Sequence, residues 1–136
     1  MSLYKAKLET QYLEDIAKFA ESALSAYGCV DRETMSDLLL AIDEVCTNIM
    51  THGKPSQQRD YLTLEIERVE NALSIIITDF GAPFPFETLK PVSPDAPLEE
   101  KLAHGFGIGF IKRLTDEQHY RSFGERNELY LRRNLS

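Results

Sequence analysis

The chain has 136 residues, 43% of them apolar, which is enough to bury the core of one globular domain but short for two. Its 22 acidic residues outnumber its 15 basic ones, and the formal net charge of −7 argues against a nucleic-acid-binding surface. No segment approaches the roughly 18 consecutive apolar residues of a membrane span, and the N-terminus lacks the apolar run of a secretory signal, so we expect a cytoplasmic protein without membrane contact.

The first predicted elements are a strand and a helix. Residues 3–9 alternate weakly between apolar and polar side chains, as a half-exposed strand does. The helix that follows is predicted to have Thr10 as its N-cap and to end at Gly28. Its apolar face repeats at helical spacing and consists of Leu13, Ile16, Ala17, Ala20, Ala23, Leu24 and Tyr27.

A second helix is predicted from the cap residue Asp31 to a stop at residues 53–56. Its C-terminal part, residues 38–53, carries an apolar face and a polar face. The apolar face consists of Leu38, Leu39, Ile42, Val45, Cys46 and Ile49. The two cysteines of the chain, Cys29 and Cys46, have no metal-ligand spacing, so we expect reduced cysteines that pack in the core.

Glu44 and Asn48 dominate the polar face of this second helix. They are four residues apart, which places them one turn apart, away from the centre of the apolar face. The small residue Ala41 beside them would let a ligand come close to the backbone. Taken alone, the pair is also typical of a solvated helix face. His52, just before the predicted stop, is more typical of a C-terminal cap than of a catalytic residue.

A hairpin of two strands is predicted next. Residues 61–69 alternate between apolar and polar side chains, and residues 73–78 are rich in β-branched side chains, which favours a central position for the second strand. That strand delivers Asp79 at its C-terminal end. Asp79, Phe80 and Gly81 form a pattern typical of a turn, but the glycine also lets a flat ligand approach the backbone.

A long irregular segment precedes a glycine cluster. Residues 83–104 contain five prolines and no sustained periodicity, which is typical of a functional loop such as a lid. Gly105, Gly107 and Gly109 then alternate directly before an apolar helix at residues 110–114. Glycines at a helix N-terminus expose backbone N–H groups, which suit a phosphate. The spacing is neither the dinucleotide-binding fingerprint nor a P-loop.

The last predicted elements are two strands, at residues 118–123 and 128–132. They form a hairpin that turns at residues 124–127. The chain contains no internal repeat and no low-complexity tail.

Three motifs follow one another along the chain: a helix with Glu and Asn four residues apart, a strand end with Asp-x-Gly, and Gly-x-Gly before a helix. In this order they closely resemble the GHKL ATPase superfamily, and within it the chain is similar to serine-kinase anti-sigma factors. The most specific portions are residues 43–48 with His52 and Gly53, residues 79–84, and residues 107–117.

The resemblance implies a two-layer α/β sandwich of the α+β class, with helices on one face of a mixed, largely antiparallel sheet, the Bergerat-type ATP-binding fold. Residues 1–136 would form a single domain, with an ATP lid at about 83–104. ATP or ADP with Mg²⁺ would lie between the long helix and this lid.

Roles for particular residues also follow from the resemblance. Asn48 would coordinate Mg²⁺ through its amide oxygen. Asp79 would accept a hydrogen bond from the adenine amino group, and Gly81 would leave room for the ring. Glu44 would act as the general base that deprotonates an incoming hydroxyl group.

The same resemblance assigns the glycine cluster to the phosphates. Gly105 and Gly107 would present backbone N–H groups to them, with Gly109 as close support. Related kinases commonly carry an arginine just ahead of the glycines. Here Lys101 and His104 would supply part of that charge, without the bidentate geometry of a guanidinium.

A second departure lies in the final turn. Residues 125–128 lack the small threonine motif that often helps to hold adenine in the wider superfamily. Both departures bear more on phosphoryl transfer than on nucleotide binding.

Several functions are compatible with these motifs. The first is an anti-sigma protein with serine/threonine kinase activity, whose partners are a sigma factor and a small anti-anti-sigma protein. The alternative is a non-catalytic, nucleotide-gated module that sequesters a regulatory partner. A sensor histidine kinase domain would need an upstream dimerisation helix with a phosphoacceptor histidine, and a domain without any ligand is a further possibility. A homodimer is implied by the resemblance alone.

Overall fold

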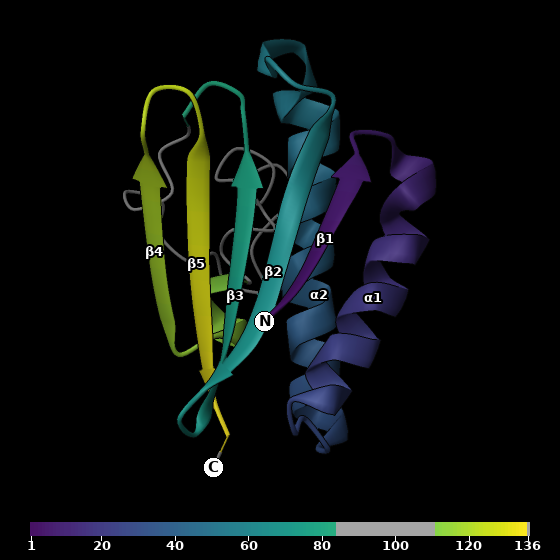
Figure 1. Ribbon diagram of the computed structural model, residues 1–136, viewed down its shortest axis with the longest axis vertical. Helices are drawn as coiled ribbons and strands as arrows, with labels where there is room; N and C mark the ends of the chain where they lie inside the picture. Colours follow the sequence, from purple (N-terminus) through teal and green to yellow (C-terminus); the bar gives the residue numbers. More distant parts are fainter. Residues whose placement is uncertain (84–110, 136) are drawn as a thin grey trace, which may run out of the picture.

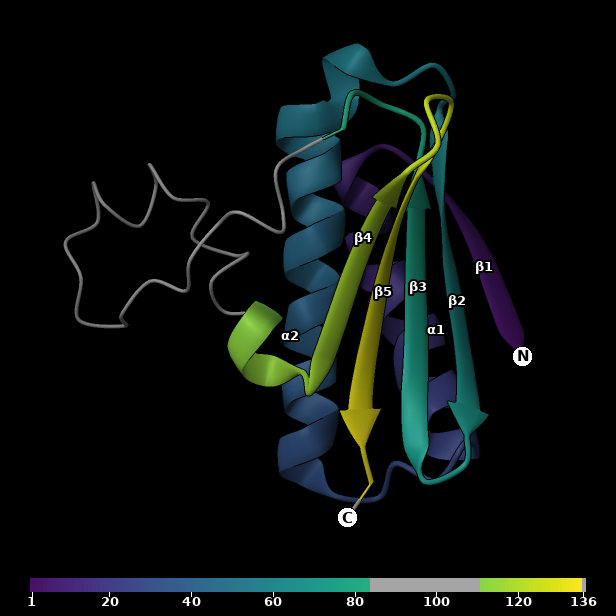
Figure 2. The same cartoon turned by 90° about the vertical axis from the view of Figure 1, so that its left-hand side faces the viewer.

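The computed structural model describes residues 1–83 and 111–135. Two helices lie on one side of a five-stranded sheet whose strand order is β1-β2-β3-β5-β4 (Figures 1 and 2). The helices are α1 (Leu13–Ala26) and α2 (Arg32–Asn48), and the strands are β1 (Ser2–Lys7), β2 (Tyr61–Val69), β3 (Ala72–Asp79), β4 (Glu117–Ser122) and β5 (Asn127–Asn134). Every pairing between these strands is antiparallel, so the expected two-layer, largely antiparallel fold is confirmed.

The core lies between the sheet and the helices. Along β2, Leu62, Leu64 and Ile66 are fully buried, whereas the residues between them are partly exposed on the other face, because successive side chains of a strand point to opposite faces. β3 lies at the centre of the sheet, as its composition predicts, and Ile75 and Ile77 join the same core. Burial of a side chain of this size contributes about 1.5–3 kcal/mol to folding.

α1 begins later than the sequence predicts. Thr10 lies inside a 3₁₀ turn, Thr10–Tyr12, and the residue before α1 makes no side-chain cap, so the expected cap at Thr10 is wrong. Ala17 is exposed, and the aromatic ring of Phe19 instead contacts Tyr4 of β1 with 4.9 Å between ring centroids. Gly28 follows the helix with φ of +100°, a conformation that favours glycine, which confirms the predicted end.

α2 begins where the sequence predicts. The carboxylate of Asp31 accepts hydrogen bonds from the backbone N–H of Thr34 at 3.0 Å and from its hydroxyl group at 2.8 Å. These bonds occupy one of the N–H groups that a helix N-terminus leaves without an intrahelical partner.

The end of α2 differs from the expectation. The α-helix ends at Asn48, but the chain continues through a π-helical turn, Ile49–Gly53, and a 3₁₀ turn, Lys54–Ser56. The helical path therefore ends at Ser56, within the predicted stop at residues 53–56, and only the change from an α-helix to a π turn after Asn48 differs from the expectation. Pro55 lies at the start of the 3₁₀ turn, where its missing N–H group removes no internal hydrogen bond.

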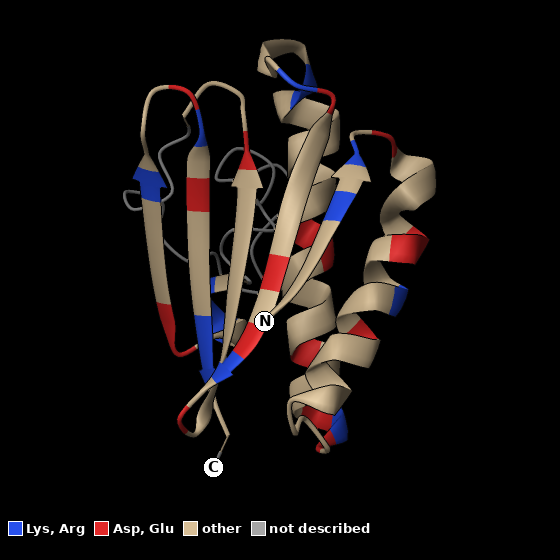
Figure 3. Cartoon of the chain, in the orientation of Figure 1, with Lys and Arg blue, Asp and Glu red and all other residues tan. Residues whose placement is uncertain are grey.

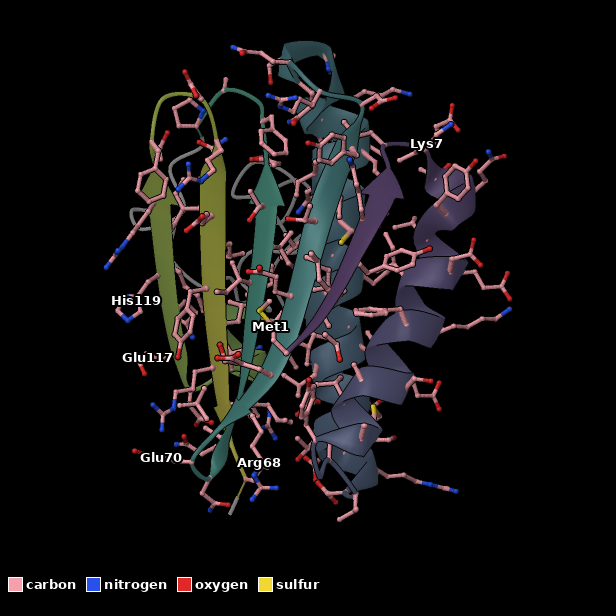
Figure 4. All side chains as sticks on the ribbon, in the orientation of Figure 1. Met1, Lys7, Arg68, Glu70, Glu117 and His119 are labelled. Carbon is pink, nitrogen blue, oxygen red and sulfur yellow. The ribbon has the colours of Figure 1, made fainter. Side chains whose placement is uncertain are left out.

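Charged residues lie mostly outside the core. Acidic residues recur along α1 and α2 (Figure 3), and each of them is exposed or partly exposed. On β4, Glu117 and His119 lie on the sheet face away from the helices, and His119 Nε2 lies 2.8 Å from Glu117 Oε1 (Figure 4).

No helix in the described part of the chain is both long and apolar enough to cross a membrane.

A partly buried arginine joins the end of the chain to α2. Residues 111–114 are helical, and Ile111 is fully buried. Arg133 of β5 donates from Nη1 to the carbonyl oxygen of Leu114 at 2.7 Å and to Asp37 of α2 at 3.0 Å. Arg133 therefore fixes the helix that follows the glycine motif against α2.

Candidate functional site

Asp79 ends the central strand on the side of the sheet that faces the helices. It follows Ile75 and Ile77 on this face, since the three residues alternate along β3. The end of β3, the π turn after α2 and the β4–β5 turn all lie at the same end of the molecule (Figure 1). The predicted position of Asp79 at a strand end is confirmed.

Asn127 holds one side of the Asp79 carboxylate. It is the first residue of β5 and lies opposite Asp79 in the strand register. Its amide nitrogen donates to Asp79 Oδ1 at 2.8 Å and to the carbonyl oxygen of Gly81 at 2.9 Å. The residue is only 2% exposed. A single amide therefore ties the strand end to the turn that follows it.

Gln57 contacts the other oxygen of the Asp79 carboxylate. Its amide nitrogen donates to Asp79 Oδ2 at 3.4 Å and to the carbonyl oxygen of Gly53 at 3.1 Å, and its amide oxygen accepts from the backbone N–H of Phe80 at 2.8 Å. Beside it, the hydroxyl group of Ser56 accepts from the backbone N–H of Ala82 at 3.0 Å. These contacts bring together the ends of two predicted motifs, one at Gly53 and one at Asp79.

Burial and hydrogen bonding change the pKa of Asp79 in opposite directions. Burial raises the pKa of this carboxyl group above its ordinary value, because a low-dielectric environment disfavours the charged form. The hydrogen bonds from Asn127 and Gln57 act against this by stabilising the carboxylate. The result is a polar group held in one orientation at the edge of an apolar core.

Gly81 lies against Gln57. A Cβ atom at this position would lie 2.1 Å from Gln57 Nε2 and 2.7 Å from the Ser56 hydroxyl oxygen, closer than real Cβ contacts. Packing of the turn thus gives a reason for glycine that needs no ligand. Its role beside a base stays a prediction.

We expect Gly81→Ala to destabilise the protein by about 1–3 kcal/mol, the usual range for overpacking. The added methyl group displaces the Gln57 amide and breaks its bonds to Gly53, Asp79 and Phe80. Urea denaturation of Gly81→Ala, Gln57→Ala and the double variant measures this effect. If the contact with Gln57 is the cause, Gly81→Ala costs much less in the Gln57→Ala background; an equal cost in both backgrounds would contradict the explanation.

Glu44 and Asn48 lie in the last two turns of α2, and both are partly exposed. Burial, and secondarily the negative charge of Asp43, raises the pKa of Glu44 above its ordinary value of 4.5. No group within residues 1–83 and 111–135 hydrogen-bonds to either side chain. The π turn begins directly after Asn48, and single π turns are rare and frequent at functional sites.

Two neighbours of this pair, Ala41 and His52, differ in their burial. Ala41 is fully buried in the core rather than open beside Glu44, because its position on α2 turns it toward the sheet. His52 is exposed in the π turn. The expectation that a ligand reaches the backbone at Ala41 is therefore wrong.

The remaining predicted residues lie outside the described part of the chain. They are Lys101, His104, Gly105, Gly107 and Gly109, together with the predicted lid after Pro83. Sequence reasoning missed Gln57 and Asn127. The signal for Asn127 is its register: extending the final hairpin by one residue places it opposite Asp79.

No cluster of three or more His, Cys, Asp or Glu side chains that could hold an ion occurs among the described residues. A single amide oxygen at Asn48 fits an ion such as Mg²⁺, which keeps several waters and shares its remaining positions with substrate phosphates.

Comparison with known proteins gives a consistent result. Residues 5–133 match the family described as "Histidine kinase-like ATPase domain". The chain is 33% identical over 89 residues to "Serine-protein kinase RsbW" of Bacillus mycoides (strain KBAB4), covering 62% of this chain and 55% of that protein. It is 24% identical over 117 residues to "Serine-protein kinase RsbW" of Bacillus velezensis, covering 83% and 72%. The chain thus spans about half the length of the first of these relatives.

Two solved structures share the fold. The RsbU and RsbW domains of Rv1364c from Mycobacterium tuberculosis match with a TM-score of 0.64 and 12% identity, over 98% of this chain and 32% of that one. The Acinetobacter baumannii histidine kinase AdeS matches with a TM-score of 0.53 and 13% identity, over 100% and 70%. At these identities the likeness concerns the fold alone.

Proposed function

The chain belongs to the histidine kinase-like ATPase domain family, and from this premise we propose that it is an ATP-dependent anti-sigma regulatory protein that phosphorylates a serine or threonine of a small anti-anti-sigma partner. Membership in the family implies ATP binding. Distant similarity to proteins named serine-protein kinase RsbW suggests kinase activity at the level of the family.

The proposed nucleotide site rests on one observation: the Asp79 carboxylate is fixed between the amides of Asn127 and Gln57 at the end of β3. Each carboxylate oxygen has more than one lone pair, so Asp79 keeps acceptor capacity after these two bonds. An acceptor held in this way recognises the amino group of adenine. Gly81, in the turn directly after it, then lies beside the base.

The end of α2 is assigned to the phosphates. In this proposal Asn48 holds Mg²⁺ through its amide oxygen, and Gly105, Gly107 and Gly109 offer backbone N–H groups, with Lys101 and His104 nearby as positive charge. When bound, ATP supplies the reactive phosphoryl group, and Mg²⁺ supplies a counter-charge for it. Glu44 lies one helical turn before Asn48 on the same face.

Glu44 is the general base of the proposed reaction. Its raised pKa brings it nearer to the neutral range, where a base accepts a proton more effectively while it is still ionised. The carboxylate orients the hydroxyl group of the incoming side chain and takes its proton as the phosphoryl group is transferred.

The partners are proposed by analogy with the relatives. We assign a sigma factor as the protein that is sequestered and an anti-anti-sigma protein as the phosphoryl acceptor, with a homodimer as the assembly. Labelled γ-phosphate from Mg-ATP should appear on a serine or threonine of such an acceptor.

The second candidate is a nucleotide-gated module that binds a partner without transferring phosphate. The sequence feature that favours it is the absence of an arginine from residues 101–104, directly ahead of the glycines. A partner that is captured only with nucleotide and never labelled would support this second function and contradict the first.

A further inference from the structure

A groove with a basic rim lies beside the candidate site, at the end of the molecule where β1 ends and β2 begins (Figure 1). Lys7, the last residue of β1, is there the register partner of Tyr61. The backbone N–H of Leu8 donates to the carbonyl oxygen of Asp60 at 3.0 Å, which holds the two segments together. The volume of this basic groove is about 470 Å³, and the charged side chains that line it are Lys7, Glu9, Lys54, Arg59 and Asp60.

The cations of the basic groove have no acidic partner in the described part of the chain. Lys7, Lys54 and Arg59 are all exposed, at an end of the molecule where basic residues gather (Figure 3). Even Glu9 and Asp60, which line the same groove, form no ion pair with them. Three cations against two carboxylates leave the groove with a positive excess, whereas the whole chain has a formal net charge of −7. An anionic partner is therefore attracted to this groove and repelled by most of the remaining surface.

Two aromatic rings beside the groove hold cations over their faces. Arg59 Cζ lies 5.4 Å from the centroid of the Phe80 ring. Lys5 Nζ lies 3.8 Å from the centroid of the Tyr61 ring, and Lys5 extends the basic rim because it projects from the same side of β1 as Lys7. A ring face that a cation covers is not open to a stacked base, so these rings do not favour single-stranded nucleic acid as the occupant.

The backbone of the groove does not form a phosphate site. A single phosphate is typically held by several backbone N–H groups or by a fork of arginines that converge on it. The cations here come instead from three separate segments: the end of β1, the 3₁₀ turn and the loop before β2. Four backbone N–H groups of the lining residues already donate to backbone carbonyl oxygens, namely those of Leu8, Glu9, Gln57 and Gln58. Separated cations along a groove fit carboxylates that are spaced along a chain.

We propose that the basic groove is a docking site for an acidic segment of a partner protein. Carboxylates of the segment pair with Lys7, Lys54 and Arg59. This inference goes beyond the proposed function, because none of these cations is assigned to the nucleotide. Gln57 lines the groove and also contacts Asp79 Oδ2, so the docked segment lies directly beside the candidate nucleotide site.

The first test measures binding to the unaltered protein by fluorescence anisotropy. The probe is a labelled peptide of about twelve residues in which glutamate and aspartate alternate with serine, and its control has glutamine and asparagine in their place. We expect the acidic peptide to bind at least about tenfold more tightly, because each exposed ion pair contributes up to about fivefold, and to weaken as salt is added. Equal affinity for both peptides would overturn the inference, as would tighter binding of a short oligothymidine. No nucleotide is needed, so failure of ATP to bind would overturn the proposed function and leave this test intact.

The second test assigns the binding to the groove. A variant with Lys7→Glu, Lys54→Glu and Arg59→Glu should bind the acidic peptide at least about tenfold more weakly. The matched control makes the same change in net charge at three exposed cations outside the groove: Lys18, Arg32 and Arg121. It should stay within about threefold of the unaltered protein at about 0.15 M salt, because screening limits the effect of distant charges. Equal losses in the two variants would show that overall charge, and not the groove, governs binding.

Urea denaturation checks that both variants are folded. If the charge reversals prevent folding, glutamine at the same three groove positions removes the charges without adding repulsion, and this milder variant should bind the acidic peptide at least about threefold more weakly. Unchanged affinity in the folded groove variant would contradict the docking site.

Discussion

Glu44→Ala should reduce phosphoryl transfer to the acceptor protein by about 10²- to 10⁴-fold, the usual contribution of a general base. The carboxylate is partly buried and lies one helical turn before Asn48. Glu44 is the only acidic residue at that place on α2 among the described residues. Binding of Mg-ATP should change little, because Glu44 is assigned to the hydroxyl nucleophile rather than to the nucleotide. Transfer of labelled γ-phosphate under single-turnover conditions measures the effect, with titration of Mg-ATP alongside it.

The dependence on pH separates a base from a merely structural carboxylate. In its proposed role as a base Glu44 must be ionised, and burial raises its pKa above 4.5, so transfer should rise with pH through that raised pKa and then level off. Asp43→Asn is the matched control. It should retain transfer but shift the rise to lower pH, because removing the negative charge of Asp43 lowers the pKa of Glu44. Normal transfer in Glu44→Ala would remove this residue from the mechanism.

Asp79→Asn should weaken binding of Mg-ATP by about 10- to 100-fold. The substitution keeps the shape of the side chain but exchanges one acceptor oxygen for a donor. That donor would face either the amide of Gln57 or the amide of Asn127, and the amino group of the base would lose its charged acceptor. Calorimetric titration of the variant measures the loss. Unchanged affinity would show that Asp79 is not the residue that recognises the base.

Stability against pH provides a control for Asp79→Asn. Because the folded protein raises the pKa of Asp79 above 3.8, the native state holds this proton more tightly than the unfolded state. The free energy of unfolding of the unaltered protein should therefore fall, relative to Asp79→Asn, as pH rises from below 3.8 through the raised pKa. Urea denaturation at several pH values measures this trend, and the opposite trend would mean that the hydrogen bonds outweigh burial.

The fold could be predicted wherever a pattern is local. The alternation of residues 61–69 predicts β2 with its observed bounds, Tyr61–Val69, because one face of this strand is buried and the other is partly exposed. The cap at Asp31 and the stop at Gly28 follow from the chemistry of single residues. The place of Asp79 at the end of the central strand follows from the composition of β3.

The features that could not be predicted depend on contacts between distant residues. Asn127 reaches Asp79 across 48 positions of sequence, and its register opposite Asp79 becomes visible only once β5 is known to pair with β3, which no local pattern indicates. Gln57 belongs to a loop whose path is set by the π turn, and no local pattern in the sequence indicates a change in helical pitch after Asn48. Ala41 sits at the border of two helix faces, so a small rotation of α2 decides whether it is open or buried.

The most direct test of the account is a calorimetric titration of Mg-ATP into the unaltered protein and into Asn48→Ala, with the titrations repeated in EDTA. We expect magnesium-dependent binding to the unaltered protein that is lost, or weakened by at least about tenfold, in Asn48→Ala, since one metal ligand is removed while the base-binding residues are kept. Absence of binding to the unaltered protein, or equal binding by both proteins with and without magnesium, would contradict the assignment of the nucleotide site to the end of α2.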